Sequence, residues 1–219
     1  MRVSATHPAF NGKVDDLLIF TQVVPIDGPG GVLASAGPLI VTGGPLASRL
    51  PFVGCMQFDS ADIALLESQG ALENTVVHEM GHVLGIGTFW SDLSTGICAD
   101  PEQAGLPTFT GAKSVAEWAT LNGGTPSGNV PIEDGGGPGT QCGHWDEETF
   151  FTELMTGFLN TAADPLSRLT IASLEDLGYT VDYSAAEPYS LPGCSPNCSG
   201  LRAQGHTDAW EIVKVYTLP

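Results

Sequence analysis

One stretch decides the fold of this chain: Thr75-Val76-Val77-His78-Glu79-Met80-Gly81-His82-Val83-Leu84-Gly85. The residues from Ala71 onward are compatible with a helix, and residues four apart on a helix share one face. His78 and His82 therefore present their imidazoles side by side, at a separation that a single metal ion can bridge. The pattern predicts a metal-binding helix over residues 71–84, which ends where Gly85 lets the chain turn away.

Glu79 follows the first of these histidines directly, so its carboxylate can reach a metal-bound water without being a ligand. Two histidines with an adjacent carboxylate form the zinc-protease signature. Zinc lowers the pKa of its bound water towards ~7, and the glutamate accepts the proton as the water attacks a peptide carbonyl. The same pentad also occurs by chance, as an ordinary helix with two surface histidines. Gly85, three residues after His82, favours the zinc interpretation.

The third ligand is not where the compact metzincin pattern has it. That pattern has a histidine six residues after the second one, and here the position is Thr88, which is not a usual zinc ligand. The chain has five histidines. His7 and His206 lie near its ends in polar, turn-rich surroundings, where we expect them to be solvated. His144, followed by Trp145 and an acidic run, is the remaining candidate.

The pentad with Gly85, the displaced histidine followed by Trp145, and the run Glu153-Leu154-Met155-Thr156-Gly157 resemble the leishmanolysin family of metzincin zinc endopeptidases. The likeness extends from about residue 14 to residue 182. In that family an insertion separates the glycine from the third ligand, and a methionine-containing turn lies beneath the metal. The resemblance implies one zinc ion per chain, with these roles: His78, His82 and His144 as ligands, Glu79 as general base, and Met155 as the turn methionine.

We therefore expect an α+β fold, a metzincin-like zinc protease catalytic domain that occupies residues 1–219 as a single domain. Residues 1–85 form an N-terminal subdomain, a mixed twisted sheet that carries the active-site helix. Residues 86–143 are an insertion, largely irregular with one helix near 114–121. Residues 144–219 are an irregular and helical C-terminal subdomain with the third ligand and the methionine turn.

The periodicity predicts strands over residues 14–24, 32–41 and 52–58. The third is expected at the edge of the cleft, where a substrate strand could add along residues 54–58. Beside the zinc helix, the pattern predicts helices over residues 61–69, with Asp59 or Ser60 as the cap, and over 146–153 and 164–177.

Composition excludes some partners. The chain has 7 Lys+Arg against 25 Asp+Glu and a formal net charge of −18, which argues against nucleic acid and anionic membrane surfaces as partners. No run reaches the ~18 apolar residues of a membrane span. The first residues lack the apolar core of a signal peptide, although the family resemblance implies an extracellular or cell-surface location. The sequence sets no oligomeric state.

Five cysteines leave at least one unpaired within the chain. In an oxidising compartment, Cys98 with Cys142 could tie the insertion back beside His144, and Cys194 with Cys198 could close a small loop. The alternative is free, reduced thiols.

Glu133 and Asp134, with the glycines that follow them, could form an oxygen-rich calcium site. The alternative there is a solvated turn.

The expected activity is the hydrolysis of internal peptide bonds in proteins, by Glu79-assisted attack of a zinc-bound water. Two alternatives stay open. One is a catalytically silent zinc-binding module for adhesion or recognition. The presence of Glu79 together with all three histidines argues against it. The other is a zinc hydrolase of small peptides or other small molecules, which a closed pocket rather than an open groove would favour.

Overall fold

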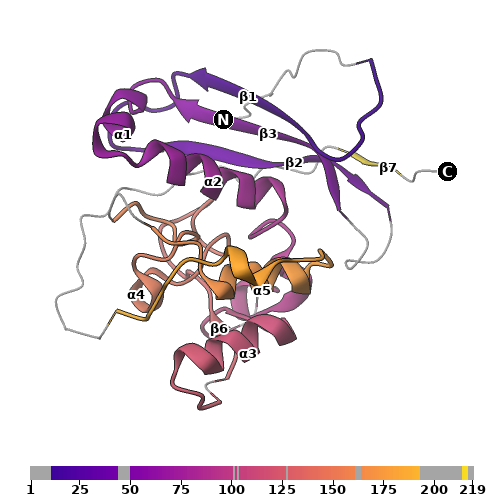
Figure 1. Ribbon diagram of the computed structural model, residues 1–219, viewed down its shortest axis with the longest axis vertical. Coiled ribbons are helices and arrows are strands. Elements are labelled where there is room, and N and C mark those ends of the chain that lie inside the picture. Colours follow the sequence, from indigo (N-terminus) through magenta and orange to yellow (C-terminus); the bar gives the residue numbers. More distant parts are fainter. Residues whose placement is uncertain are drawn as a thin grey trace.

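The computed structural model describes residues 11–43, 50–100, 102, 104–126, 128–160 and 164–192, with the backbone of 214–216. Figure 1 shows two halves, a sheet with two helices above and a half built of short elements below. We call residues 11–85 with 214–216 the upper half and residues 86–192 the lower half. The architecture is α+β, as the sequence predicts.

The sheet of the upper half is mixed and has the strand order β1-β3-β2-β7. Its strands are β1 (Leu18–Val24), β2 (Ala34–Thr42), β3 (Pro51–Asp59) and β7 (Lys214–Tyr216). β1 runs parallel to β3, β2 runs antiparallel to β3, and β7 pairs in parallel with the end of β2.

The expectation that residues 52–58 form the cleft edge is wrong. β3 lies between β1 and β2, and every one of its residues except Phe52 is buried. A run that is apolar on both faces is typical of a central strand, and periodicity alone does not give strand order. Among the described residues, the cleft edge is instead the first part of β2, because β7 pairs only with residues 40–42 of that strand.

Two helices follow the sheet, α1 (Ile63–Gln69) and α2 (Leu72–Val83), within about two residues of the predicted bounds. The predicted cap of α1 is wrong. Asp62 occupies the N-cap position and makes no side-chain capping bond, whereas the Asp59 carboxylate accepts the N–H of Ala61, which precedes the helix, and those of residues 26–28. Neither Asp59 nor Ser60 therefore caps the helix.

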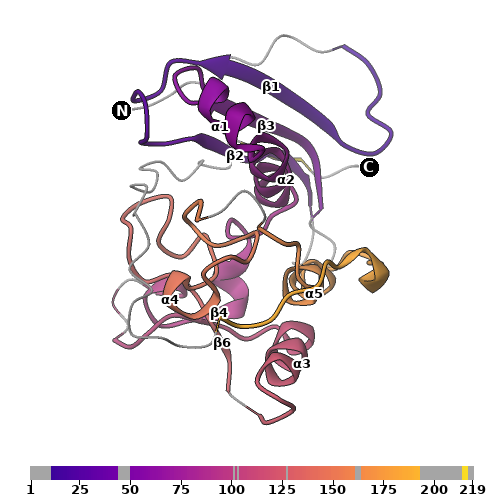
Figure 2. The same cartoon turned by 60° about the vertical axis from the view of Figure 1, so that its left-hand side comes forward.

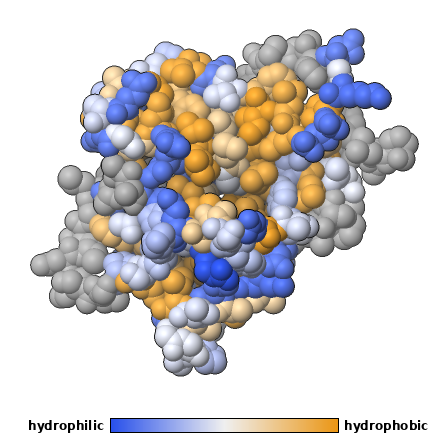
Figure 3. Space-filling model, viewed as in Figure 1, coloured by the Kyte–Doolittle hydropathy of each residue, from blue (hydrophilic) through white to orange (hydrophobic). Residues whose placement is uncertain are grey.

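Helix α2 joins the halves. Its residue Val83 is fully buried in a cluster with Met56 and Phe58 of the central strand, and Val76 packs against the same cluster. In Figures 1 and 2, α2 lies between the sheet above and the elements of the lower half below. Figure 3 shows apolar surface over this side of the upper half. Val77 and Met80 of α2 are exposed.

The lower half is more regular than expected. Besides the predicted helix, here α3 (Ala112–Leu121), the insertion contains a three-stranded sheet in the order β4-β5-β6. These strands have two residues each, Ser94–Thr95, Thr108–Phe109 and Val130–Pro131, too short for a periodic pattern. Turns of 3₁₀ helix span Trp90–Leu93, Gly96–Cys98 and Tyr183–Ala185. Within the described ranges, no helix has both the length and the apolar composition of a membrane span.

Two predicted helices are shorter than expected. The helix after His144, α4, spans only Glu147–Phe150, because Phe151 takes a φ of 48° and turns the chain back. The last helix, α5, spans Arg168–Asp176 rather than 164–177. Pro165 disfavours helical geometry before it, and Ser167 provides the N-cap by accepting from the Thr170 N–H.

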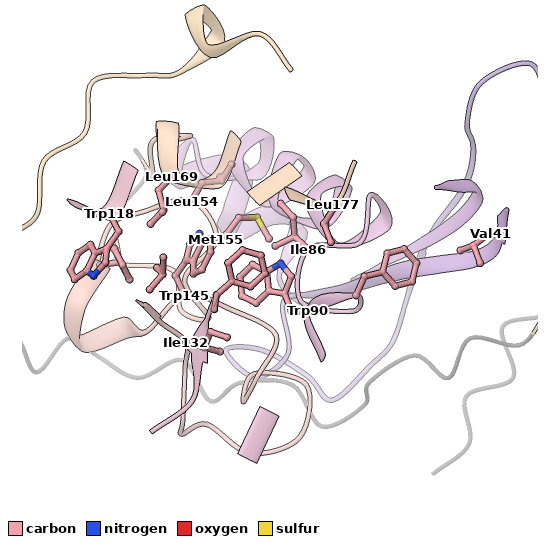
Figure 4. Close-up of a cluster of buried hydrophobic side chains, with 14 residues drawn as sticks. Val41, Ile86, Trp90, Trp118, Ile132, Trp145, Leu154, Met155, Leu169 and Leu177 are labelled. Atoms are coloured by element: carbon pink, nitrogen blue, oxygen red, sulfur yellow. The ribbon is translucent and has the colours of Figure 1, made fainter. Parts of the chain in front are cut away.

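The core of the lower half is aromatic. Trp145 is fully buried, with its ring centroid 4.3 Å from that of Trp90 and 5.6 Å from that of Phe109. Figure 4 shows Met155 in the middle of this cluster, beside Trp145 and Ile86. Because His144 directly precedes Trp145, the core that buries the indole also fixes the backbone of the histidine.

The disulfide between Cys98 and Cys142 is present, with a Cα–Cα distance of 5.3 Å. It ties the insertion to the loop before His144, as the sequence suggested for an oxidising compartment. Cys55 is a free thiol buried in the sheet. The pair Cys194 and Cys198 lies outside the described residues, as do His7 and His206.

Buried carboxylates hold the connection between β1 and β2, residues 26–32. Asp59 Oδ2 accepts backbone N–H bonds from residues 26–28 at 3.3, 2.9 and 2.9 Å, and Asp62 Oδ1 accepts one from Gly30 at 2.8 Å. Burial raises the pKa of the Asp59 carboxyl, but the N–H donors around it outweigh burial and leave the pKa below its usual value. The connection leads directly into the free edge of β2.

Asp59→Asn should lower the free energy of unfolding by about 1–3 kcal/mol at neutral pH, because the amide cannot accept all the bonds that the carboxylate accepts. The folded-state pKa is the lower one, so the Asp59 contribution is lost as pH falls through it. The gap between the two proteins should therefore narrow below about pH 4. Urea unfolding at several pH values measures this, with the exposed Asp16→Asn as the control. A difference in unfolding free energy that does not change with pH would contradict the lowered pKa of Asp59.

Candidate metal centre

Helix α2 carries His78 and His82 one turn apart and ends directly after them. Gly85 has a φ of 107°, a left-handed conformation that glycine adopts without strain, as the predicted end of the helix requires. The turn brings the backbone carbonyl of Ile86 to 3.0 Å from Nδ1 of His82. The sequence of the turn thus orients the second imidazole.

His144 reaches the same place from the lower half, 62 positions after His82. It is buried, and its Nδ1 lies 3.0 Å from the carbonyl oxygen of Thr140 in the preceding loop. The next residue, Trp145, donates its backbone N–H to the carbonyl of Met155 at 3.0 Å. The structure therefore brings together the three histidines that the sequence singled out.

The Nε2 atoms of the three imidazoles converge. They are 2.9 Å apart between His82 and His78, 3.0 Å between His82 and His144, and 3.2 Å between His78 and His144. Each Nδ1 faces a backbone carbonyl, and the carbonyl opposite His78 is that of Leu154, at 2.7 Å. A carbonyl can only accept, so each Nδ1 carries the ring proton.

This tautomer leaves three Nε2 lone pairs that point at one place. Neutral imidazoles in this state cannot hydrogen-bond to one another there, and their lone pairs repel unless a cation lies between them. Three nitrogens bound about 2.0–2.1 Å from one tetrahedral zinc ion would lie about 3.3 Å apart, close to the spacing here. His78, His82 and His144 thus form a group that could hold a metal ion, and the donor set suits zinc.

Glu79 lies in the same cleft with an unsatisfied oxygen. The residue is 5% exposed, and its Oε2 has no hydrogen-bond partner within the described part of the chain. Burial raises the pKa of its carboxyl to about 8. A buried polar atom without a partner is costly, so its place beside the histidines indicates a position that a polar ligand or water fills.

Met155 packs against α2 at Gly81, the residue before His82. A Cβ on Gly81 would lie 2.8 Å from the Met155 sulfur, so a glycine is needed for this approach. Met155 is fully buried, with Trp145 and Ile86 beside it in Figure 4. The methionine turn of the sequence therefore contacts the histidine helix directly.

The histidines and Glu79 line a cleft of about 380 Å³ between the halves. Its upper wall is α2 with residues 31–36, and its lower wall is formed by residues 139–144 and the segment from Leu154 to Leu159. Thr88 lines the cleft as well, but its hydroxyl is not a usual zinc ligand.

Two carboxylates of the predicted oxygen-rich site, Glu133 and Asp134, lie near a third one, Asp146, that the sequence did not single out. Carboxylate oxygens of the three residues lie within 4.8 Å of one another. Asp134 is exposed, and both oxygens of Glu133 already accept backbone N–H bonds, from Gly135 and Glu147. Calcium binding there stays a prediction.

Sequence reasoning missed the groups that hold the ligands. The acceptors behind the histidines are main-chain carbonyls of Leu154, Ile86 and Thr140, which carry no side-chain signal. The cleft rim at residues 31–36 was missed because strand order does not follow from periodicity. Glycines in residues 28–31 were the one visible sign of a special loop there.

Three inward-facing imidazoles beside a buried carboxylate, in a cleft between two halves, are typical of the class of metal-dependent enzymes that includes the zinc hydrolases. Within that class the comparison with known families is specific. The family model for leishmanolysin, peptidase family M8, matches residues 4–200. The chain belongs to the leishmanolysin family, and the resemblance drawn from the sequence is confirmed.

Curated relatives agree over shorter segments. A leishmanolysin-like peptidase of Drosophila pseudoobscura pseudoobscura is 43% identical over 68 residues, which are 29% of this chain and 10% of the relative. Those of Drosophila melanogaster and Caenorhabditis elegans are 43% and 44% identical over 58 and 57 residues, each 26% of this chain and 8% of the relative. The matched segments thus span a tenth or less of these longer proteins.

Loss of a residue that hydrogen-bonds to a metal ligand typically lowers metal affinity by roughly 10–100-fold. His144→Ala removes a proposed ligand itself and should therefore lower zinc affinity by more than this. Thr88→Ala should leave zinc binding nearly unchanged, because Thr88 lines the cleft outside the histidine group. Competition with a chromophoric chelator measures both affinities. Zinc binding that survives the loss of His144 but not the loss of Thr88 would make the ligand set wrong.

Proposed function

We propose that this chain is the catalytic domain of a zinc metalloendopeptidase of metzincin type. His78, His82 and His144 would hold one zinc ion, Glu79 would act as general base, and Met155 would be the turn methionine. The observation that carries the proposal is the convergence of three Nε2 lone pairs beside a Glu79 oxygen that has no partner among the described residues. The proposed domain comprises an N-terminal part up to residue 85, the insertion 86–143 and a C-terminal part from 144.

Zinc, when bound, would supply Lewis-acid chemistry, polarising the scissile carbonyl and a water molecule. Three neutral imidazoles suit that chemistry, since they add no negative charge to the ion and leave a position open. Glu79 is not among the converging donors. The positive charge of a zinc ion bound beside it would favour the ionised form of its buried carboxyl, which could then accept the proton of the attacking water. It would then pass that proton to the leaving amine.

The substrate would lie extended along the free edge of β2. Residues 34–36 pair with β3 on one side, and the opposite edge has no strand partner among the described residues. Residues 31–36 line the cleft that holds the histidines. An extended peptide could therefore add to β2 through main-chain hydrogen bonds, which suits internal bonds of varied sequence.

The disulfide between Cys98 and Cys142 supports an extracellular or cell-surface location, because such bridges persist in oxidising compartments. The strongly acidic composition gives no basis for nucleic acid as a partner. Protein or peptide substrates are the partners that we propose.

Digestion of casein and of a peptide library, with and without a chelator, tests the activity. We expect internal cleavage products by mass spectrometry, loss of cleavage on metal removal, and recovery when zinc is added back. Cleavage confined to short peptides would favour the small-peptide hydrolase, and zinc binding without any cleavage would favour a silent recognition module.

Glu79→Gln should lower kcat by about 10²–10⁴-fold, the range that general acid–base catalysis contributes, while about one zinc per chain is retained. Gln has the same size but cannot accept the proton. Glu73→Gln, an exposed position on the same helix, should leave both quantities unchanged. Elemental analysis beside a fluorogenic peptide assay measures them, and near-normal turnover in Glu79→Gln would remove Glu79 as the base.

A further inference from the structure

Glu153 is a buried carboxylate with four hydrogen-bond donors around it. It is 1% exposed and belongs to the turn that carries Met155. Its Oε2 accepts the Met155 N–H at 2.6 Å. Its Oε1 accepts the Ser167 N–H at 3.2 Å and the hydroxyls of Ser167 and Thr170, both at 2.6 Å. One carboxylate thus fastens the methionine turn to the start of α5.

This turn is connected to the first histidine. Leu154, the residue between Glu153 and Met155, offers the carbonyl that receives the Nδ1 proton of His78 at 2.7 Å. The Leu154 N–H is itself bonded to the carbonyl of Pro165 at 3.1 Å. The position of the Leu154 carbonyl, and with it the orientation of the His78 ring, depends on the backbone that Glu153 holds.

The same carboxylate is connected to the third histidine. The indole N–H of Trp145 donates to the Thr170 hydroxyl at 2.9 Å, while that hydroxyl donates to Glu153. The Trp145 backbone N–H donates to the Met155 carbonyl at 3.0 Å. Trp145 directly follows His144, so two bonds fix the backbone that presents the imidazole.

Every partner of Glu153 donates, so the side chain must act only as an acceptor. Glutamine at this position is nearly isosteric but brings an N–H₂ group. If that group replaces Oε2, it faces the Met155 N–H, and if it replaces Oε1, it faces the Ser167 N–H. Neither backbone donor can reverse its role, so each orientation of the amide leaves a buried donor opposed to another donor.

We propose that Glu153 is a positioning residue of the metal centre, whose carboxylate fixes the His78 and His144 imidazoles through the methionine turn and Trp145. The inference rests on the proposed zinc site and assigns Glu153 no contact with metal or substrate. Groups that orient metal ligands typically contribute 10–100-fold to metal affinity. Glu153 orients two of the proposed ligands, His78 and His144.

Glu153→Gln should therefore weaken zinc binding by about 10–100-fold while the chain stays folded. Chelator competition gives the affinity, and circular dichroism gives the fold. The visible spectrum of the Co²⁺-loaded protein gives the ligand geometry, which should shift in this variant. Asp176→Asn is the matched control, because Asp176 also accepts bonds from two backbone N–H groups and a hydroxyl, but at the start of α3.

Asp176→Asn should lose stability without changing zinc affinity or the Co²⁺ spectrum. If Glu153→Gln does not fold, Thr170→Val is tested instead, since it removes the hydroxyl between Glu153 and Trp145 and should weaken zinc binding in the same direction. A folded Glu153→Gln or Thr170→Val with wild-type affinity and spectrum would overturn the proposal. Failure of the wild-type protein to bind zinc would instead overturn the proposed function itself.

Discussion

The rest of the site depends on three carbonyl oxygens that face the Nδ1 atoms of His78, His82 and His144. They determine which ring nitrogen carries the proton, and so they turn three Nε2 lone pairs toward one point. Lone pairs that meet in this way are favourable only around a cation. A place for a metal ion is thus built into the backbone, since the carbonyls belong to the helix end, the loop before His144 and the methionine turn.

The two halves contribute different parts of the site where the Nε2 atoms converge. The upper half contributes a rigid helix, packed through Val83 against the central strand, and a strand edge at residues 34–36. The lower half contributes a single histidine whose position is fixed by an aromatic core around Trp145. Buried carboxylates hold the loops next to these elements. Asp59 and Asp62 hold the β1–β2 connection in the upper half, and Glu153 holds the turn with Met155 in the lower half. The loops that border the cleft are therefore fixed by buried groups.

The features that could be predicted from the sequence are those set by interactions between residues close together in the chain. The helix with its two histidines and its glycine end is a local pattern, and it was placed within about two residues. His144 was only the remaining candidate among five histidines until the family resemblance gave it a role, and Met155 was found only through that resemblance, because nothing local connects either residue to His82. The strand order, the two-residue strands of the insertion and the carbonyl acceptors could not be predicted, since they arise from pairing and packing across the chain. The early end of α4 has the same origin, because the chain turns back at Phe151 and the next residues bond to the start of α5 through Glu153.

X-ray absorption at the zinc edge tests the central claim most directly, because it reports the atoms that surround the bound metal. The account predicts one zinc per chain with three imidazole nitrogens at about 2.0–2.1 Å, one further oxygen and no sulfur. A sulfur ligand at about 2.3 Å, or fewer than three imidazoles around a fully loaded ion, would contradict it.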